Sequence, residues 1–183
     1  MIFEDKKITL KNGVTAILKT PEITDAAKML SYIKTACGET EFLARYPEEW
    51  DSMSIENEEK WIKNSRASQN TLLIACYIDD EVVGNCEITF KTGVKVCHRA
   101  TVAIAILKEY WGLGIGSAMF EELLAAAKAR PKIEIVELEF VEGNDRARAL
   151  YEKFGFRIVG ERPNALKFKN GKMAKEYFMQ RIL

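Results

Sequence analysis

The chain has 183 residues, about half of them apolar, which suits one hydrophobic core and predicts a single domain over residues 1–183. Its 27 lysines and arginines balance 27 aspartates and glutamates, which disfavours a general nucleic-acid binder with a basic surplus. The first ten residues lack the apolar run of a secretory signal, and no apolar run approaches the roughly 20 residues of a membrane helix. We therefore expect a cytoplasmic protein that binds neither membranes nor nucleic acid.

Cysteine and histidine are sparse and offer little reactive chemistry. No two cysteines form a Cys-x-x-Cys pair, and the single histidine, His98, cannot complete a zinc-type cluster by spacing. His98 follows Cys97 directly, but neighbours on a strand point to opposite faces, which disfavours a nucleophile–base pair. We expect no metal and no disulfide framework. The cysteines are expected to be small buried side chains, namely Cys37, Cys76, Cys86 and Cys97.

The first 38 residues predict a hairpin followed by a helix. Asn12-Gly13 separates two β-rich runs within residues 8–19, and Asn-Gly in that position is typical of a hairpin turn. Thr24 or Asp25 is then expected to cap a helix that ends at Gly38. The predicted core-facing residues of this helix recur at helical spacing and are Ala26, Met29, Leu30, Ile33 and Cys37.

Residues 39–60 form an acidic stretch in which eight carboxylates are opposed by only two basic residues. Ser54, followed by Glu58 and then by Trp61-Ile62, predicts a second short helix in this region. A run of charge is usually a solvated helix face. The alternative is that these carboxylates attract a cationic ligand.

The middle of the chain predicts a second hairpin and a buried strand. Thr71–Ile78 and Glu81–Phe90 are expected to pair as strands around Asp79-Asp80. Arg99–Leu107 is almost continuously apolar from Val102, a pattern typical of a central strand covered on both faces. A glycine-rich turn and a helix ending near residue 131 follow, with apolar residues at helical spacing: Met119, Phe120, Leu123, Leu124 and Ala127.

The last third of the chain predicts three strands and one more helix. Ile133–Val141 is expected to be a strand, and a helix is expected between Asn144 and Gly155. Phe156–Gly160 and Met173–Leu183 are expected to be the closing strands. The order β-β-α-α-β-β-β-α-β-α-β-β mixes hairpins with strand–helix–strand units. It predicts an α/β fold, a single three-layer domain whose mixed, mostly antiparallel sheet of about six or seven strands has helices on both faces.

The main chemical signal is the segment IAILKEYWGLGIGS at residues 104–117. A buried strand runs into Gly112, Gly114 and Gly116 and then into a helix, whose first turn has unpaired N–H groups and a partial positive charge. Together these features predict a phosphate-binding turn. The spacing matches neither the P-loop pattern GxxxxGK[ST] nor the dinucleotide pattern GxGxxG, because position 117 is serine. The alternative is a tight strand–helix connection that binds no ligand.

Two segments resemble the GNAT superfamily of N-acetyltransferases. AILKEYWGLGIGSAMFEELL resembles the cofactor loop of that family, [Q/R]xxGxG/A: Gly114 and Gly116 match its two glycines, and Trp111 replaces its polar first residue. The strand pair EVVGNCEITF is a weaker match. The resemblance covers residues 70–160 and leaves the N-terminal part unassigned. In GNDRARALYEKFGF, which resembles a later helix opened by asparagine, the matching residues are Asn144, Ala147, Tyr151, Gly155 and Phe156.

The resemblance implies acetyl transfer from acetyl-CoA to a primary amine of a small molecule, peptide or protein, by direct attack in a ternary complex. It implies an acetyl-CoA-binding core at about 71–160, an acceptor side at about 22–70 and C-terminal strands at 156–183. In this family the sheet splays at its centre and the pantetheine arm bonds to one strand, here Ala105–Leu107, so that the Ile106 amide would stabilise charge on the reacting oxygen. The implied cofactor-binding residues are Ala105, Ile106, Leu107, Trp111, Gly112, Leu113, Gly114, Ile115, Gly116, Ser117, Asn144, Ala147 and Tyr151.

The reaction needs a proton donor and a proton acceptor. Tyr151 is the implied acid for the leaving thiolate, and its spacing also fits a core tyrosine on an amphipathic helix. The strand Arg99–Leu107 has no glutamate at the place where some members of the resembled family keep a base. The candidates for the base are therefore His98, Glu87 and Glu139, with a chain of water molecules as the alternative.

The acidic stretch is the candidate for acceptor binding. Carboxylates interleaved with aromatic side chains would suit an amine on an apolar stem, such as a polyamine, an aminoglycoside or a basic N-terminus, and equally a helix packed on the core. The candidate residues are Glu41, Phe42, Tyr46 and Trp50. Two other functions stay open: a non-catalytic acyl-CoA-binding regulatory module on the same fold, and a nucleotide-binding protein that uses only the glycine turn. A homodimer also stays open.

Overall fold

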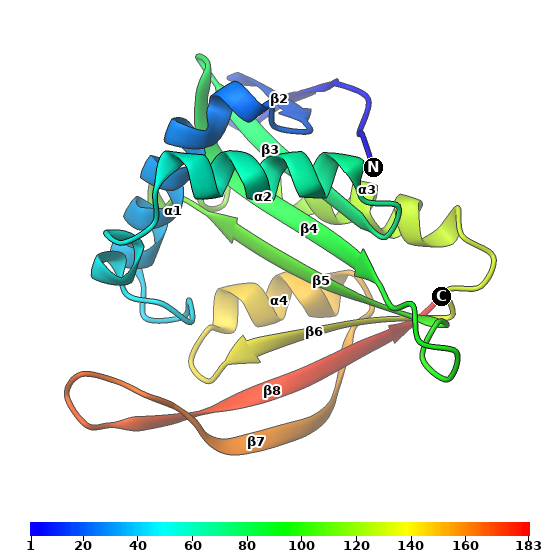
Figure 1. Cartoon of the computed structure of the whole chain (residues 1–183). Coiled ribbons are helices and arrows are strands. Elements are labelled where there is room, and N and C mark those ends of the chain that lie inside the picture. The colour runs from blue at the N-terminus through cyan, green and yellow to red at the C-terminus, as the bar shows by residue number, and fades with distance from the viewer.

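An eight-stranded sheet forms the centre of the computed structural model, which describes residues 1–183 (Figure 1). The strands are β1 (Lys6–Thr9), β2 (Thr15–Lys19), β3 (Thr71–Ile78), β4 (Glu81–Phe90), β5 (Arg99–Ile106), β6 (Ile135–Val141), β7 (Arg157–Lys167) and β8 (Met173–Ile182). Their spatial order is β1-β2-β3-β4-β5-β6-β8-β7, and only the β5–β6 pair is parallel. The mixed, mostly antiparallel α/β domain is confirmed, and all eight strands of the predicted order join the sheet, which was expected to contain about six or seven.

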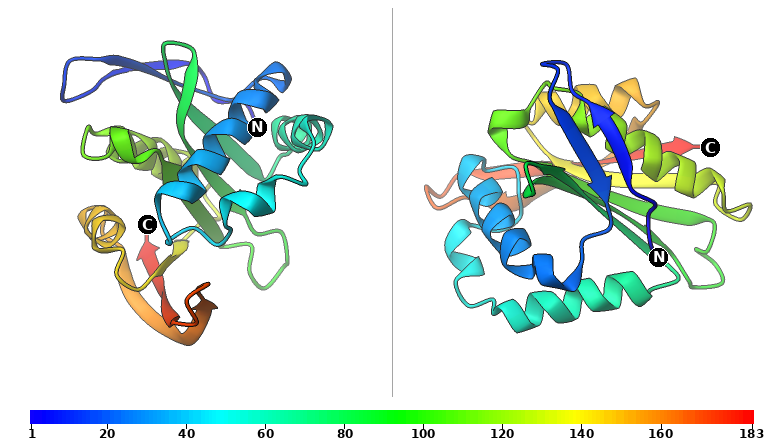
Figure 2. Two further views of the ribbon diagram at one scale, coloured as in Figure 1. Left: turned by 90° about the vertical axis from the view of Figure 1, so that its left-hand side faces the viewer. Right: turned by 90° about the horizontal axis from the view of Figure 1, so that it is seen from above.

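Two helices cover each face of the sheet, so the domain has three layers (Figure 2). The helices are α1 (Ala26–Glu39), α2 (Ile55–Ala67), α3 (Ile115–Lys128) and α4 (Asp145–Lys153), and the short 3-10 helices are η1 (Ile23–Asp25), η2 (Pro47–Trp50) and η3 (Lys108–Tyr110). α1 and α2 lie on one face, and α3 and α4 lie on the other. None of the helices is long and apolar enough to cross a membrane.

Each face of the sheet buries its own hydrophobic core. The larger core lies under α3 and α4 and includes the fully buried side chains of Phe120, Leu123 and Phe156. The smaller core lies under α1 and α2 and includes Met29 and Ile62. Burial of one such side chain stabilises the fold by about 1.5–3 kcal/mol. The apolar stripes of the helices therefore fix where each helix lies on the sheet.

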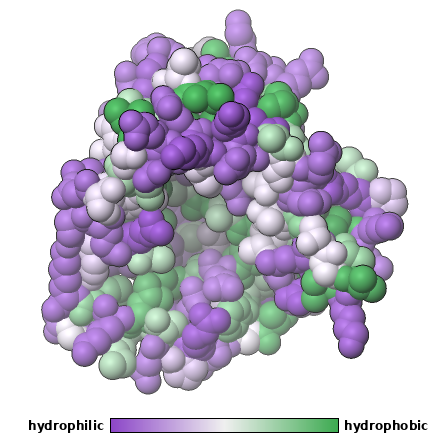
Figure 3. All heavy atoms as spheres, viewed as in Figure 1, coloured by the Kyte–Doolittle hydropathy of each residue, from purple (hydrophilic) through white to green (hydrophobic).

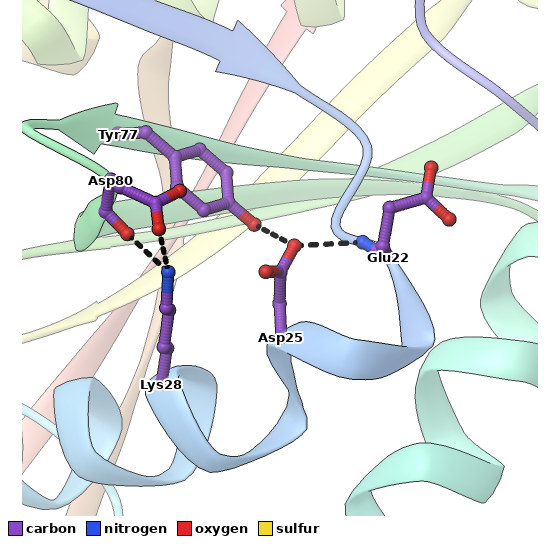
Figure 4. A network of polar contacts seen from close by, with 5 residues as sticks. All are labelled: Glu22, Asp25, Lys28, Tyr77 and Asp80. Carbon is purple, nitrogen blue, oxygen red and sulfur yellow. Dashed lines mark hydrogen bonds and ion pairs between the residues drawn. The ribbon is translucent and has the colours of Figure 1, made fainter.

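A polar network around Asp25 fixes α1 to the sheet (Figure 4). The Asp25 carboxylate accepts hydrogen bonds from the Tyr77 hydroxyl at 2.7 Å and from the Glu22 amide at 2.9 Å. Lys28 forms an ion pair with Asp80 in the β3–β4 turn. Asp25 therefore anchors the start of the helix to β3. It occupies the predicted N-cap position, but its side chain does not cap α1.

β5 and β6 separate after a short region of contact. They pair at only three positions, from Arg99–Ile135 to Thr101–Glu137. Beyond this point the C-terminal half of β5 has no strand partner on the β6 side, and residues 103–106 are exposed or half-buried. The prediction of a strand covered on both faces is therefore wrong for this half of β5, because its apolar residues border a gap in the sheet.

Two further element boundaries differ from the prediction. Gly38 lies inside α1 and does not end it, and a β-carbon at this position would lie 3.3 Å from Pro47 Cγ, so glycine lets the following segment pack closely. β7 continues beyond the predicted end at Gly160 and passes through Pro163. Since β7 is the edge strand and its pairing with β8 is irregular around Pro163, a residue without an N–H is tolerated there.

Candidate active site

A groove of about 1000 Å³ lies where β5 and β6 diverge. β5, the glycine turn before α3, α4 and the end of β6 line it, and so do residues 40–46, Arg162 and residues 165–168. Figure 3 shows a hollow in the middle of this side of the molecule, with apolar surface around and below it. Of the predicted cofactor-binding residues, all except Leu107 and Leu113 line this groove.

The backbone of β5 is arranged to pair with an extended ligand. The Leu107 amide donates to the Val83 carbonyl of β4 at 2.9 Å. Because successive residues of a strand direct their backbone groups to opposite edges, the amides of Ile104 and Ile106 point away from β4, toward the gap beside β6. The Ile106 carbonyl accepts a hydrogen bond from the Trp111 indole at 2.7 Å, so the Ile106 amide is the group left for a ligand.

The glycine turn presents further amides at the end of β5. Gly112 and Gly114 have φ values of +81° and +106°, which residues with side chains rarely adopt. Gly114 is the N-cap of α3, and the Ala118 amide donates to the Gly114 carbonyl at 3.1 Å. The amides of residues 115–117 precede this bond, so they have no helical partner and carry the positive end of the helix dipole.

Basic side chains that no sequence motif singles out surround the glycine turn. The Arg146 guanidinium of α4 lies over the Trp111 ring, 5.2 Å from its centre. The Lys153 ammonium donates to the Ser117 hydroxyl at 2.9 Å, and Lys11 also lines the groove. These cations come from separate segments, so only the fold gathers them. Together with the free amides they form a site suited to phosphate groups.

Asn144 and Tyr151 both line the groove from α4. Asn144 is the N-cap, and its side-chain oxygen accepts a hydrogen bond from the Ala147 amide at 3.2 Å. Tyr151 is only 7% exposed and packs against Phe120 and Phe140. Burial raises the pKa of its hydroxyl to about 12, which keeps the hydroxyl protonated. The ring therefore belongs to the larger core while the residue also reaches the groove.

The three predicted base candidates lie in different places. Glu139 of β6 lines the groove. His98 lies in the turn before β5, at the strand end remote from the glycine turn, and does not line the groove. Glu87 accepts a hydrogen bond from the Thr89 hydroxyl of β4 at 2.9 Å and is not part of the groove lining either.

Glu139 has a neighbour in Glu176, a residue that belongs to no recognised sequence motif. The Glu176 carboxylate of β8 accepts a hydrogen bond from Arg162 at 2.8 Å, and all three residues line the groove. Burial and the neighbouring Glu139 carboxylate raise the pKa of Glu176. Only the antiparallel register of β6 and β8 brings the two carboxyl groups together, so no local spacing could have predicted the pair.

A second pocket, of about 560 Å³, lies between α1, α2 and η2 on the other face of the sheet. We call it the α1–α2 pocket. Of the candidate acceptor residues, Trp50 lines this pocket, whereas Glu41, Phe42 and Tyr46 line the groove. The lining of the α1–α2 pocket consists of Met29, Tyr32, Ile33, Arg45, Trp50, Met53, Asn57, Glu58, Trp61 and Asn85.

The acidic stretch is divided between surface and interior. Glu48 forms an ion pair with Lys169, and Asp51 forms one with Lys34, both at the surface. Glu58 is the one carboxylate of residues 39–60 that is buried. Most of the stretch is therefore the solvated surface that such charge runs usually form, and Glu58 is the exception.

Known proteins resemble this chain along most of its length. The model of the Acetyltransferase (GNAT) family matches residues 38–156. The L-amino acid N-acetyltransferase AaaT of Escherichia coli (strain K12) is 28% identical over 110 residues, which are 60% of this chain and 67% of that protein. An N-alpha-acetyltransferase of Sulfurisphaera tokodaii is 36% identical over 92 residues, which are 45% of this chain and 54% of that protein.

Solved structures share the fold of almost the whole chain. An acetyltransferase of the GNAT family from Streptococcus pneumoniae superposes with a TM-score of 0.84 at 25% identity, over 92% of this chain and 99% of that one. The yncA protein of Salmonella typhimurium, solved with its cofactor acetyl-CoA, has a TM-score of 0.76 at 14% identity over 92% and 94% of the two chains. With the family model matching well over half of its residues, this chain belongs to the GNAT acetyltransferase family and is an N-acetyltransferase.

Proposed function

We propose that this protein transfers the acetyl group of acetyl-CoA to a primary amine by direct attack in a ternary complex. The observation that best supports this function is the direction of the Ile104 and Ile106 amides. They open onto the groove, on the strand that leads to the glycine turn. A strand edge of this kind binds an extended chain through its main-chain groups. Residues 71–160 would supply this cofactor site, with about 22–70 on the acceptor side and 156–183 closing the sheet.

The residues of the groove fit acetyl-CoA. The free amides of residues 115–117, with Arg146 and Lys153, offer donors and positive charge to the phosphates. Glycine at 112 and 114 keeps side chains away from these amides, and the apolar groove suits the pantetheine arm. Bound acetyl-CoA supplies a thioester, which is the activated acetyl donor.

Two groups of the chain would act on the charges that develop during transfer. The Ile106 amide would donate a hydrogen bond to the thioester oxygen, and one such donor contributes roughly 10²–10³ in rate. The Tyr151 hydroxyl would protonate the leaving thiolate. Its pKa of about 12 makes this transfer uphill from a phenol to an ordinary thiolate. The apolar surroundings of the groove also raise the pKa of a thiol, which reduces that difference.

A small-molecule acceptor is favoured over a protein. The α1–α2 pocket, with a volume of about 560 Å³, suits a compact molecule and is lined mainly by side chains of apolar type. The similarity to AaaT, named for L-amino acids, supports the same class. The similarity to an N-alpha-acetyltransferase makes a peptide N-terminus the second candidate.

The test is release of free thiol from acetyl-CoA in the presence of an amine panel of L-amino acids, alkylamines, polyamines and short peptides. We expect thiol release that depends on the amine, and a mass increase of one acetyl group on the acceptor. Binding of acetyl-CoA without thiol release from any amine would instead favour the non-catalytic acyl-CoA-binding module.

A further inference from the structure

The α1–α2 pocket contains one carboxylate, that of Glu58, and one cation, that of Arg45, among walls that are mainly apolar and aromatic. Glu58 projects from the first turn of α2, and the indole rings of Trp50 and Trp61 line the same pocket. Met29 and Met53 complete much of the apolar surface. A carboxylate beside indole rings is the combination that attracts a cationic group on an apolar body, through charge and cation–π attraction.

Glu58 has no partner within the chain. It is only 7% exposed, and it forms no ion pair, in contrast to Glu48 and Asp51 of the same acidic stretch. Burial alone raises the pKa of its carboxyl group to about 7. The carboxyl oxygens of Glu58 are not enclosed and open onto the pocket, and a partly buried charge without a partner still destabilises a fold. Because Glu58 lies on the wall of a cavity, a cationic ligand in that cavity would form the ion pair that the Glu58 carboxylate lacks within the chain.

The pocket adjoins the strand that faces the cofactor groove. The Tyr32 hydroxyl, on the pocket wall, donates to the Ala105 carbonyl of β5 at 2.7 Å and lies 2.9 Å from the Asn85 side-chain oxygen of β4. Ala105 itself lines the groove, and Arg45 lines both cavities. Tyr32 and Arg45 are therefore the side chains that link the pocket to the groove and to the part of β5 that lines it.

We propose that Glu58 binds the ammonium group of the acceptor in the α1–α2 pocket and removes its proton, and that the acceptor is a primary amine on a compact apolar body. This inference rests on the proposed acetyl transfer and names the substrate class and the base for it. The apolar walls hold the body of the acceptor, and Glu58 holds its charged end.

The proton balance of the step is complete. The ammonium gives one proton to the Glu58 carboxylate, directly or through one water molecule, and becomes a neutral amine with a free electron pair. The nitrogen forms a bond to the acetyl carbon while the carbon–sulfur bond breaks. The second proton of the nitrogen balances the one that the thiolate receives, and Glu58 returns its proton to solvent. The products are the amide, the free thiol and one released proton.

Burial in the pocket, and not a neighbouring charge, sets the pKa of Glu58. From α1 the titratable group on the pocket wall is Tyr32, whose burial raises its pKa, so that it stays neutral. From the segment before η2 it is Arg45, which is exposed and lies over the Trp50 ring. The Asp25 carboxylate of η1 is engaged by Tyr77, and β4 contributes only the neutral Asn85.

The test compares Glu58→Gln with Glu56→Gln, since Glu56 lies in the same helical turn and is exposed. With phenethylamine as acceptor at pH 7.5, we expect Glu58→Gln to lower kcat/KM at least about 10²-fold, the low end for a general base. Affinity for acetyl-CoA should stay unchanged in both variants, and Glu56→Gln should keep its rate. Loss of less than about twofold in a folded Glu58→Gln protein would overturn the proposal.

The pH profile separates a base from a structural carboxylate. In the wild type, kcat/KM should rise to a plateau above about pH 7, because Glu58 must be ionised. In Glu58→Gln it should keep rising about tenfold per pH unit toward the amine pKa near 10, because only the neutral amine then reacts. Parallel profiles for the two proteins would contradict the proposed role.

The same assay tests the proposed substrate class by comparing kcat/KM among acceptor amines. We expect phenethylamine and apolar L-amino acids to react with higher kcat/KM than spermidine or a lysine-rich peptide, because the pocket offers one carboxylate and apolar walls. Preference for spermidine would overturn this inference and leave acetyl transfer intact. Absence of thiol release with every amine would instead overturn the proposed function.

Discussion

Tyr151 lies between the aromatic core and the groove, so its ring and its hydroxyl have different surroundings. Its ring centre is 5.4 Å from that of Phe120 and 5.9 Å from that of Phe140, so the ring contributes to packing. Its hydroxyl is the part that a leaving thiolate would use. Removal of the hydroxyl alone therefore separates a chemical role from a structural one.

Tyr151→Phe should lower kcat by roughly 10²-fold while the KM for acetyl-CoA changes little, because a proton donor acts mainly in the transition state. The ring and its packing are kept, so thermal melts should match the wild type. Tyr177→Phe is the matched control, since Tyr177 stacks on Phe140 at 5.1 Å but does not line the groove. A Tyr151→Phe enzyme with more than half of the wild-type kcat would assign thiolate protonation to solvent or to another group.

Glu58 should also leave a signature in stability. Its folded-state pKa of about 7 lies above the usual glutamate value near 4.3, so ionisation destabilises the folded state as pH rises from about 4 through 7. The stability advantage of Glu58→Gln over the wild type should therefore increase from pH 5 to pH 8.5. Allowing for screening by water in the pocket, we expect about 1 kcal/mol, or roughly 2–4 °C for a chain of this length. The gain is measured by melts at both pH values, with Glu56→Gln showing no such change.

The sequence pointed to candidate site residues only where one short segment contains the whole pattern. Asn144 and Tyr151 lie on one helix, so their spacing placed them on one side of it. Arg146 lies on the same helix, but its relevance arises from Trp111 in a different segment. Glu58 could not be distinguished from the other carboxylates of its stretch, because its burial depends on how α1 and α2 pack.

At the scale of elements, the glycine turn combines two requirements. Gly114 has a positive φ and its β-carbon position is open, so its role is conformational and leaves the amides accessible. Gly116 lies inside the first turn of α3, where a β-carbon would lie 3.0 Å from Leu150 of α4. The first glycine therefore shapes the proposed phosphate site, and the second lets the two helices that line the groove approach each other.

Gly114→Asp should weaken acetyl-CoA binding more than 10-fold, which corresponds to about 1.4 kcal/mol, by placing a carboxylate beside the pyrophosphate. Gly114→Ala shares the backbone strain without the charge, so it should lose less affinity. Gly171→Asp is a second control, because Gly171 also has a positive φ, of +84°, in open space but lies outside the groove lining. Calorimetric titration gives the affinities, and a folded Gly114→Asp protein that binds acetyl-CoA normally would make the turn purely structural.

Element types were predictable because local signals agreed with the tertiary structure. The hairpin at Asn12-Gly13 and the helix opened by Ser54, whose hydroxyl accepts from the Asn57 amide at 3.2 Å, follow from turn and cap chemistry. The core-facing side of α1 was less predictable: Tyr32 and Ala36 are buried, whereas the predicted Leu30 and Ile33 are only half-buried. Tyr32 was not among the predicted core-facing residues. Its ring packs in the smaller core, and its hydroxyl donates a hydrogen bond to the Ala105 carbonyl of β5, a partner that only the fold supplies.

At the scale of the whole molecule, the groove divides the sheet into two parts. One part contains β1 to β5 and the other contains β6 to β8, and the direct strand contact between them is three residue pairs long. The larger core under α3 and α4 supplies the remaining connection. A ligand that fills the groove would touch β5 and α4 at once and so add a link between the two parts.

Acetyl-CoA should therefore stabilise the whole fold. At 100 times its dissociation constant, a ligand that binds only the folded state adds about 2.7 kcal/mol. For 183 residues this corresponds to a rise in Tm of about 5–10 °C. NAD and ATP at the same concentration should raise the Tm far less, because neither carries the pantetheine arm that would pair with β5. Hydrogen exchange should show the mechanism, with new protection at the amides of Ile104 and Ile106 when acetyl-CoA is present. Equal stabilisation by NAD or ATP, or a Tm rise without protection at these two amides, would mean that the groove does not bind the cofactor along β5.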